Sequence, residues 1–264
     1  MLGFIGTGNM ATAIIKGVLA SGMLKGDEIA IYDIATEKSD ALGKEYGISV
    51  FDSEKEIARK CDKVILSVKP NVFPSLLGKI DNDLKENNPL IISIAAGKTI
   101  EFISDCLSYD AKIVRVMPNI NAKVGAAVSA YCGKDNVTVA ELDFVKKLCE
   151  SFGIAVNINE NLFSVYSAIG GCSPAFAYMF IDSLARAAVK NGMPKNVALE
   201  VAAGAVLGSA KMILESQEHP WQLVDQVCSP DGTTIEGVTS LQNDGFESAV
   251  MSAVQAAIDK DKRL

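Results

Sequence analysis

The sequence predicts an α/β fold with a mostly parallel sheet, followed by a second, all-helical domain. Up to residue 159, short apolar runs alternate with segments of helical periodicity, which is typical of strands connected by crossover helices. From Glu160 onward the strand pattern ends, and long Ala-, Val- and Leu-rich segments follow. We therefore expect two domains, comprising residues 1–159 and 160–264.

Six short apolar runs are the candidate strands. Several are continuously apolar, as expected for strands that are covered on both faces of a sheet. Helical patterns lie between them, for example at residues 11–20 and 139–151, and Gly153 is a suitable C-cap for the second. The predicted strands are residues 2–5, 29–32, 64–68, 90–94, 113–116 and 155–158.

Proline and glycine divide the second domain into helices, at Ser173-Pro174, Gly192-Met193-Pro194 and His219-Pro220. Residues 174–190 and 195–214 are apolar around much of their circumference, so one small core would not cover them. Either they form the centre of a monomeric bundle, or a second subunit covers the remainder. Their small Ala and Gly residues permit close helix contact, which favours a homodimer.

The composition argues against several classes of partner. The net charge is -7 and no Lys/Arg run reverses it locally, so we expect no nucleic-acid partner. Residues 197–213 are interrupted by Glu200 and Lys211 and fall short of the roughly 20 apolar residues of a membrane span, so we expect no membrane association. The first residues lack an export signal, and the six cysteines are scattered without CxxC pairs. We expect a cytoplasmic protein with reduced thiols.

The segment Gly6-Thr7-Gly8-Asn9-Met10-Ala11 follows the first predicted strand directly and opens a helix. In a G-x-G-x-x-A motif the first glycine permits a tight turn, the second lets the backbone approach a pyrophosphate, and the alanine keeps helix and strand close. The positive end of the helix then faces the phosphates. A purely structural turn is the alternative, but the context of strand, helix and second strand favours binding of a nicotinamide dinucleotide.

Asp33 ends the second predicted strand, about 20 residues beyond the motif. A carboxylate there accepts hydrogen bonds from the adenosine ribose of NADH, whereas the 2'-phosphate of NADPH requires Arg or Lys nearby. The following loop offers only Lys38, with Glu37 beside it. Asp33 therefore favours NADH; the alternative role for it is that of an ordinary turn residue.

Two further turns follow predicted strands at the carboxyl edge of the sheet, where ligands bind in folds of this class. The first contains Ser67, Lys69 and Pro70, and the second contains Ala95 and Gly97. The alternative is that both turns are only short connections between elements. Their position on the same edge as the glycine motif predicts contacts with the cofactor.

Residues 229–234 form the most distinctive polar loop of the second domain. His219 is the single histidine and no Cys/His/Asp cluster has metal-ligand spacing, so we expect neither a bound metal nor a histidine mechanism. The loop reads Ser-Pro-Asp-Gly-Thr-Thr and precedes a helix. Its backbone N–H groups, with the hydroxyls of Ser229 and Thr234, can hold a small carboxylate; the alternative is a helix N-cap with its turn.

Several motifs occur in the order found in one enzyme family. They are Gly6-Thr7-Gly8-Asn9-Met10-Ala11, Val68-Lys69-Pro70, Ser93-Ile94-Ala95-Ala96-Gly97, Arg115-Val116-Met117-Pro118-Asn119, Ser173-Pro174-Ala175 and Val227 to Thr234. By these motifs the chain resembles pyrroline-5-carboxylate reductase, which reduces 1-pyrroline-5-carboxylate to L-proline in the final step of proline biosynthesis. The Met-Pro-Asn and Ser-Pro...Thr-Thr elements discriminate, because other two-domain dehydrogenases share only the first motif.

The resemblance implies a Rossmann-type domain and a helical dimerisation domain, with hydride transfer from NADH or NADPH between the first domain and helices of the paired subunit. It also implies that dimers assemble into a higher homo-oligomer. Thr234 would take the catalytic role, and Asn119 would lie near the reacting centre. The residues implied for the carboxylate or ring nitrogen of the substrate are Ser229, Gly232, Thr233 and Thr234. Those implied for the nicotinamide side are Lys69, Pro70 and Ala95.

Three positions depart from the family pattern. Asp231 replaces a glycine and adds a negative charge where a carboxylate should bind. Residues 170–174, Gly-Gly-Cys-Ser-Pro, replace a Ser-Gly-Ser-Gly-Pro run. Glu54 stands where an asparagine is expected near the adenosine ribose, and a second carboxylate there disfavours a 2'-phosphate, which again favours NADH.

The implied chemistry requires little beyond orientation, because a protonated cyclic imine is already a strong electrophile. Two rival interpretations stay open. An NAD-dependent hydroxyacid dehydrogenase would need a catalytic lysine in residues 160–170, which contain none. A dinucleotide-binding regulatory protein without catalysis would not need the polar loop at residues 229–234.

Overall fold

The computed structural model describes residues 1–263, and their contacts form two compact units. The first contains Met1–Gly171 and the residues from Asp261 on, and the second contains Cys172–Lys260. The sequence places the division at residue 160, where the composition becomes helical. Residues 160–171 make their contacts with the first unit, where the Phe163 side chain is buried in the core.

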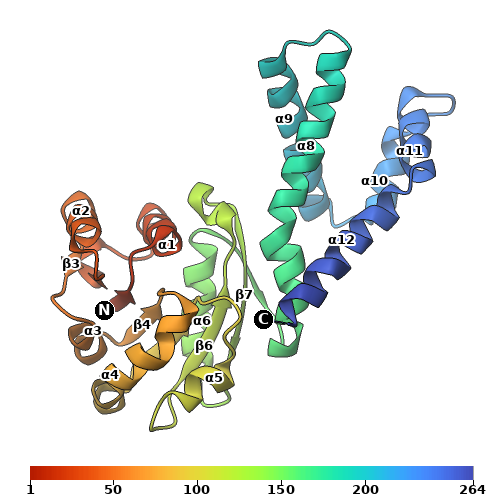
Figure 1. The fold of residues 1–264 in the computed structure, drawn as a ribbon. Coiled ribbons are helices and arrows are strands. Elements are labelled where there is room, and N and C mark those ends of the chain that lie inside the picture. The colour runs from red at the N-terminus through yellow and green to blue at the C-terminus, as the bar shows by residue number, and fades with distance from the viewer. Residues whose placement is uncertain (264) are drawn as a thin grey trace. The chain divides into compact units, whose positions relative to one another are not determined.

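An eight-stranded sheet forms the centre of the first unit (Figure 1). Every pairing is parallel except that of β6 with β7, so the predicted mostly parallel sheet is confirmed. The six predicted strands are present to within a few residues. The sequence missed β3, which is only two residues long, and β7, whose small Ala, Ser and Gly residues do not form an apolar run. In spatial order the strands are β3 (Ser49–Val50), β2 (Ile29–Tyr32), β1 (Leu2–Ile5), β4 (Lys63–Leu66), β5 (Leu90–Ser93), β6 (Ile113–Met117), β7 (Ala127–Gly133) and β8 (Gly153–Asn157).

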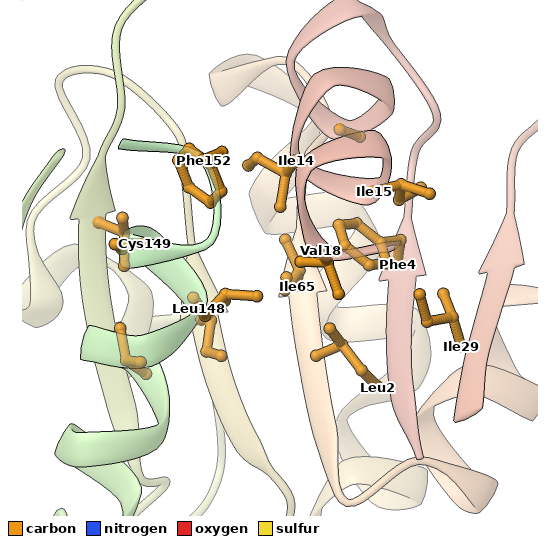
Figure 2. Packing of buried hydrophobic residues seen from close by; sticks show 14 of the residues in the cluster. Leu2, Phe4, Ile14, Ile15, Val18, Ile29, Ile65, Leu148, Cys149 and Phe152 are labelled. Atoms are coloured by element: carbon orange, nitrogen blue, oxygen red, sulfur yellow. The ribbon is translucent and has the colours of Figure 1, made fainter. Parts of the chain in front are cut away.

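Helices cover both faces of this sheet. They are α1 (Asn9–Ala20), α2 (Thr36–Tyr46), α3 (Glu54–Lys60), α4 (Phe73–Asn87), α5 (Ile100–Asp105), α6 (Val139–Glu150) and α7 (Phe163–Tyr166). On one face, Ile14 of α1 and Leu148 of α6 belong to the same buried cluster as Phe4 of β1, which Figure 2 shows. On the other face, Ile57 of α3 and Leu77 of α4 join a second cluster. Burial on both sides explains why the central strands are continuously apolar.

The second unit is all-helical, as the sequence predicts. Its helices are α8 (Ser173–Lys190), α9 (Lys195–Ser216), α10 (Pro220–Val227), α11 (Thr233–Asn243) and α12 (Phe246–Asp261), whose last residue belongs to the first unit. The buried cluster of this unit is small and consists of Ala185, Ala198 and Ala202. Large apolar side chains such as those of Met179 and Leu207 are about 70 % exposed. An apolar surface of this extent is typical of an interaction site.

The helix α9 is longer than the sequence predicts, because it continues to Ser216. Among residues 1–263, this one helix is long and apolar enough to cross a membrane by length and composition. Helices that pack inside soluble proteins pass the same test, so it is weak evidence for a membrane. Little of α9 is buried within the single chain, so its apolar side chains extend the exposed apolar surface of the second unit.

Buried thiols predict how the stability of the fold depends on alkaline pH. Burial raises the pKa of Cys61 to about 11 and the pKa of Cys132 and Cys149 to about 12, from an ordinary value of 9.0. Above pH 9 the unfolded chain releases these protons while the folded chain keeps them, so stability decreases as the pH rises toward the folded pKa values. We expect the free energy of unfolding in urea to change little up to pH 9 and to decrease from there to pH 11. The decrease should be shallower in Cys149→Ala, and an equal slope in both proteins would contradict this account.

Candidate active site

The loop that follows β1 has the geometry of an anion-binding turn. Gly6 has φ +99°, and a Cβ there would lie 2.9 Å from the Ser67 carbonyl oxygen, so the position requires glycine. Gly8 is the N-cap of α1, and a Cβ added to it would meet nothing within 4 Å. The first turn of α1 thus has room beside it for a phosphate, which the N–H groups of a helix start attract.

Strands on both sides hold this loop in place. Asp33, directly after β2, accepts hydrogen bonds through Oδ2 from the Thr7 backbone N–H at 2.6 Å and from the Thr7 hydroxyl at 3.0 Å. The Gly6 N–H donates to the Tyr32 carbonyl oxygen at 2.8 Å. On the other side, the Ser67 hydroxyl donates to the Gly6 carbonyl oxygen at 2.5 Å. The loop is therefore shaped before any ligand binds.

The carboxylate of Asp33 keeps room for a ribose hydroxyl. Its Oδ1 accepts a hydrogen bond from the Ala35 N–H at 2.9 Å, so three of about four lone-pair positions are used. Burial opposes ionisation of this carboxyl group, but hydrogen bonds from Ala35 and Thr7 outweigh it and hold its pKa below the usual value. Asp33 is therefore ionised at neutral pH, and the structure allows it to be both a turn residue and a ribose ligand.

Glu54 is the first residue of α3 and is only 4 % exposed. Its carboxylate pairs with the Lys79 ammonium group of α4 and accepts a hydrogen bond from Tyr32. Burial raises the pKa of Glu54, but the hydrogen bonds from Lys79 and Tyr32 lower it by more, so the pKa lies below its usual value. The sequence suggests a free carboxylate beside the ribose. Because Lys79 compensates its charge, Glu54 is a weaker barrier to a 2'-phosphate than the sequence indicates.

The remaining predicted cofactor residues lie at the same edge of the sheet. β4 pairs with β1 and β5 pairs with β4, all in parallel, so the turns after them meet at the carboxyl ends of the strands. Lys69 and Pro70 lie in the first of these turns. In the second, Ala95 is buried and Gly97 has φ +72°. The structure thus brings the glycine motif and both turns to the crevice where the strand order reverses.

Asn119, shortly after β6, directs its amide group inward and is only 5 % exposed. Its Nδ2 donates to the Gly170 carbonyl oxygen at 2.8 Å. Its Oδ1 accepts from the backbone N–H groups of Asn121 at 3.2 Å and Val128 at 3.3 Å. Both lone pairs of the carbonyl are used, and one amide hydrogen is left. The sequence did not indicate the contact with Gly170, because 51 residues separate the two.

Residues 229–234 of the second unit form a tight turn that ends in α11. The Gly232 N–H donates to the Ser229 carbonyl oxygen at 3.0 Å, and Asp231 has φ +55°, in the left-handed region. With Pro230 before it, this is the pattern of a type II turn, in which glycine is favoured where Asp231 stands. A Cβ on Gly232 would overlap the Ser229 hydroxyl, so a side chain there would force the Ser229 side chain to move.

Thr234 lies in the first turn of α11, at the border of an apolar groove of about 680 Å³. The groove is also lined by residues of α9 and α10, among them Gly208, Leu223 and Val227. Gly232 is the N-cap of α11, and no side-chain hydrogen bond caps this helix within the described chain. The first N–H groups of α11 and the Thr234 hydroxyl therefore form a donor set that suits a small anion.

Two family models match separate regions of the chain. Residues 160–264 match the model for pyrroline-5-carboxylate reductase dimerisation, and residues 1–97 match the model for NADP oxidoreductase, coenzyme F420-dependent. The pyrroline-5-carboxylate reductase of Escherichia coli (strain K12) is 40 % identical over 263 residues, which cover 100 % of this chain and 97 % of that protein. The chain belongs to the pyrroline-5-carboxylate reductase family. The predicted family and the class of NAD(P)-dependent oxidoreductase are therefore confirmed.

Solved structures of this family share the fold over nearly the whole chain. The Plasmodium falciparum pyrroline carboxylate reductase, crystallised with NADP bound, is 34 % identical with a TM-score of 0.86, covering 99 % of this chain and 97 % of that chain. The pyrroline-5-carboxylate reductase of Coxiella burnetii has a TM-score of 0.95 at 28 % identity, with the same coverage. A dinucleotide-binding part followed by a helical dimerisation part, as predicted from the sequence, is confirmed.

Proposed function

We propose that this protein reduces 1-pyrroline-5-carboxylate to L-proline by hydride transfer from NADH or NADPH, the final step of proline biosynthesis. The observation that carries this conclusion is the 40 % identity to the Escherichia coli pyrroline-5-carboxylate reductase over the full chain. Two features of the molecule support it. The first unit contains a glycine loop held in shape by hydrogen bonds with Asp33 and Ser67, and the second contains a turn with hydroxyl and N–H donors.

The first unit would hold the dinucleotide at the carboxyl edge of its sheet. Gly6, Gly8 and the start of α1 fit a pyrophosphate, because Gly8 leaves open space where a side chain would stand. When bound, the coenzyme supplies the hydride. Asp33 would accept a ribose hydroxyl, which favours NADH over NADPH. The residues proposed for the coenzyme site are Gly6, Thr7, Gly8, Asn9, Met10, Asp33, Glu54, Ser67, Lys69, Pro70, Ala95 and Gly97.

The turn at residues 229–234 would hold the substrate by its carboxylate. The N–H groups at the start of α11 and the hydroxyls of Ser229 and Thr233 supply the donors, and Gly232 lets the backbone approach closely. The Thr234 hydroxyl would hydrogen-bond the ring nitrogen, while Asn119 would use its remaining amide hydrogen near the reacting centre. Since a protonated imine is a strong electrophile, orientation by these groups supplies most of the rate acceleration, and no strong general base is needed.

A homodimer explains the exposed apolar surface of the second unit. Residues 160–264 match a dimerisation model, and large apolar side chains of α8, α9 and α12 are exposed in the single chain. We propose that a second copy covers them, that dimers assemble further, and that the protein acts in the cytoplasm without membrane or nucleic-acid partners. The apolar composition of α9 then reflects contact between subunits.

Steady-state oxidation of NADH in the presence of pyrroline-5-carboxylate tests the proposed function directly, and we expect turnover. Activity only with a hydroxyacid, assayed in the reverse direction, would indicate the rival dehydrogenase. Binding of NADH without turnover of either compound would indicate a regulatory protein that performs no chemistry.

Replacing Thr234 tests the assignment of the substrate site. In Thr234→Ala we expect kcat/KM for pyrroline-5-carboxylate to fall more than tenfold, a loss above roughly 1.4 kcal/mol, because the hydroxyl that orients the ring nitrogen is removed. Thr239→Ala, about one and a half turns later on the same helix, is the matched control and should retain activity. Unchanged kinetics in Thr234→Ala would remove this residue from the site.

Asp33 has two separable roles, which two substitutions distinguish. Asp33→Ala removes the acceptor that anchors Thr7, so we expect the dissociation constants of NADH and NADPH both to rise about tenfold, as expected for the loss of a charge-assisted hydrogen bond. Asp33→Asn keeps an oxygen for the Thr7 N–H but removes the charge. We therefore expect the dissociation constant of NADH to rise relative to that of NADPH. A wild-type preference for NADPH, or equal effects on both coenzymes in Asp33→Asn, would contradict the role in discrimination.

Asp231 should weaken binding of the substrate carboxylate. Asp231→Asn keeps a residue that tolerates the left-handed conformation and removes the charge, so we expect KM for pyrroline-5-carboxylate to fall about threefold at low salt. The difference should shrink as ionic strength rises, because exposed charges are screened. A KM that does not change at any ionic strength would place the substrate carboxylate away from this turn.

A further inference from the structure

Arg115 is a charged residue buried within a strand, and the assignments of coenzyme and substrate residues do not use it. It lies in the middle of β6 and is only 7 % exposed. Arginine is rarely buried unless its charge is paired, because removing the guanidinium group from water is costly. The contacts of this side chain therefore indicate what it does in the first unit.

Two residues near the start of α7 hold the guanidinium group of Arg115. Its Nη1 atom donates to Glu160 Oε1 at 3.1 Å, and its Cζ atom lies 4.3 Å from the centroid of the Phe163 ring. The Phe163 ring is itself buried in the core. Among residues 1–263 the Nε atom of Arg115 has no hydrogen-bond partner, so the buried charge depends mainly on the ion pair and the ring.

Glu160 connects Arg115 to the start of α5. The same Oε1 atom accepts a hydrogen bond from the Ile100 backbone N–H at 2.8 Å. Ile100 is the first residue of α5, and an N–H group at a helix start has no partner within its own helix. One carboxylate oxygen therefore joins β6 to the end of the loop that leads from β5 to α5.

This loop contains Ala95 and Gly97, which we propose for the coenzyme site. Its beginning is held by the sheet, because the Ile94 N–H donates to the Leu66 carbonyl oxygen at 3.2 Å. Gly97 and Thr99 are exposed, and a Cβ added to Gly97 would meet nothing within 4 Å. With so little packing in its middle, the loop depends on its two ends for its shape, and Glu160 holds the second end.

We propose that Arg115 and Glu160 are positioning residues for the nicotinamide half of the coenzyme, because they hold the end of the loop that contains Ala95 and Gly97. This inference rests on the part of the proposed function that assigns this loop to the coenzyme. All of these residues belong to the first unit. A loop that is shaped in advance costs less to order when the nicotinamide binds. Arg115 acts through Glu160 and has no need to touch the coenzyme.

A comparison of NADH with ADP-ribose, which lacks the nicotinamide, tests this role in the full-length protein. Arg115→Met serves as the background, because it leaves no buried charge without a partner. In this background Glu160→Gln keeps an oxygen for the Ile100 N–H, and Glu160→Ala removes it. We expect the dissociation constant of NADH to be about fivefold higher with Ala than with Gln, as for the loss of one hydrogen bond. The dissociation constant of ADP-ribose should be equal in the two proteins.

A second pair of variants leaves Arg115 and Glu160 in place and removes the donor. Ile100→Pro lacks the N–H group, and proline is favoured at the first position of a helix. The preceding residue, Thr99, has φ -79° and ψ 163°, a conformation that a following proline allows. Ile100→Ala keeps the N–H and is the matched control for the lost side chain. We expect Ile100→Pro to bind NADH about fivefold more weakly than Ile100→Ala, with equal affinity for ADP-ribose.

A control in the same unit distinguishes this ion pair from ion pairs in general. Arg59→Met removes an arginine whose Nε atom lies 2.7 Å from Asp83 Oδ1, in a pair that joins α3 to α4. This variant should bind both NADH and ADP-ribose as wild type does. Arg115→Met alone should lower kcat for pyrroline-5-carboxylate about tenfold, because a poorly held nicotinamide is oriented less well for hydride transfer.

The failure of this inference is distinct from that of the proposed function. Equal NADH affinity within each matched pair would overturn the inference, and so would parallel losses of NADH and ADP-ribose affinity, which indicate general damage to the coenzyme unit. The binding measurements need no substrate. A wild-type protein that binds NADH but does not reduce pyrroline-5-carboxylate would therefore refute the function alone, and one that binds neither NADH nor ADP-ribose would refute both.

Discussion

The hydrogen bonds between the Asp33 carboxylate and Thr7 are the interaction on which the rest of the site depends. They join the end of β2 to the loop after β1, while Ser67 after β4 holds the same loop from the other side. Gly6 can follow this path only because it lacks a side chain. Preparing the loop in advance means that binding an anion there costs little ordering of the backbone. We propose that the same carboxylate that shapes the loop also selects between coenzymes.

A second constraint is that the residues proposed for the coenzyme and for the substrate lie in different units. The residues proposed for the coenzyme lie in the first unit, and the hydroxyl-rich turn proposed for the substrate lies in the second. The second unit has only a small alanine-rich cluster of its own and exposes much of its apolar surface. Membership of a family with a dimerisation domain accounts for this surface without invoking a membrane.

Local sequence patterns predicted the parts of the molecule that depend on local physics. Continuous apolar runs such as that of β5 identified the buried strands, and the glycine motif identified the tight loop after β1. The sequence patterns did not predict β7, because its residues are buried although most of them are small and do not form a strongly apolar run. The pairing of Glu54 with Lys79 depends on how two helices pack, which no spacing in the sequence records. For the same reason the contact of Asn119 with Gly170 could not be foreseen.

The most direct test of the account is a crystal structure of the dimer with NAD⁺ and proline bound together. We expect the pyrophosphate on the loop from Gly6 to Ala11, and the proline ring against the nicotinamide with its carboxylate at residues 229–234. Proline bound at residues 229–234 but beyond reach of the nicotinamide, or bound at another surface altogether, would contradict it.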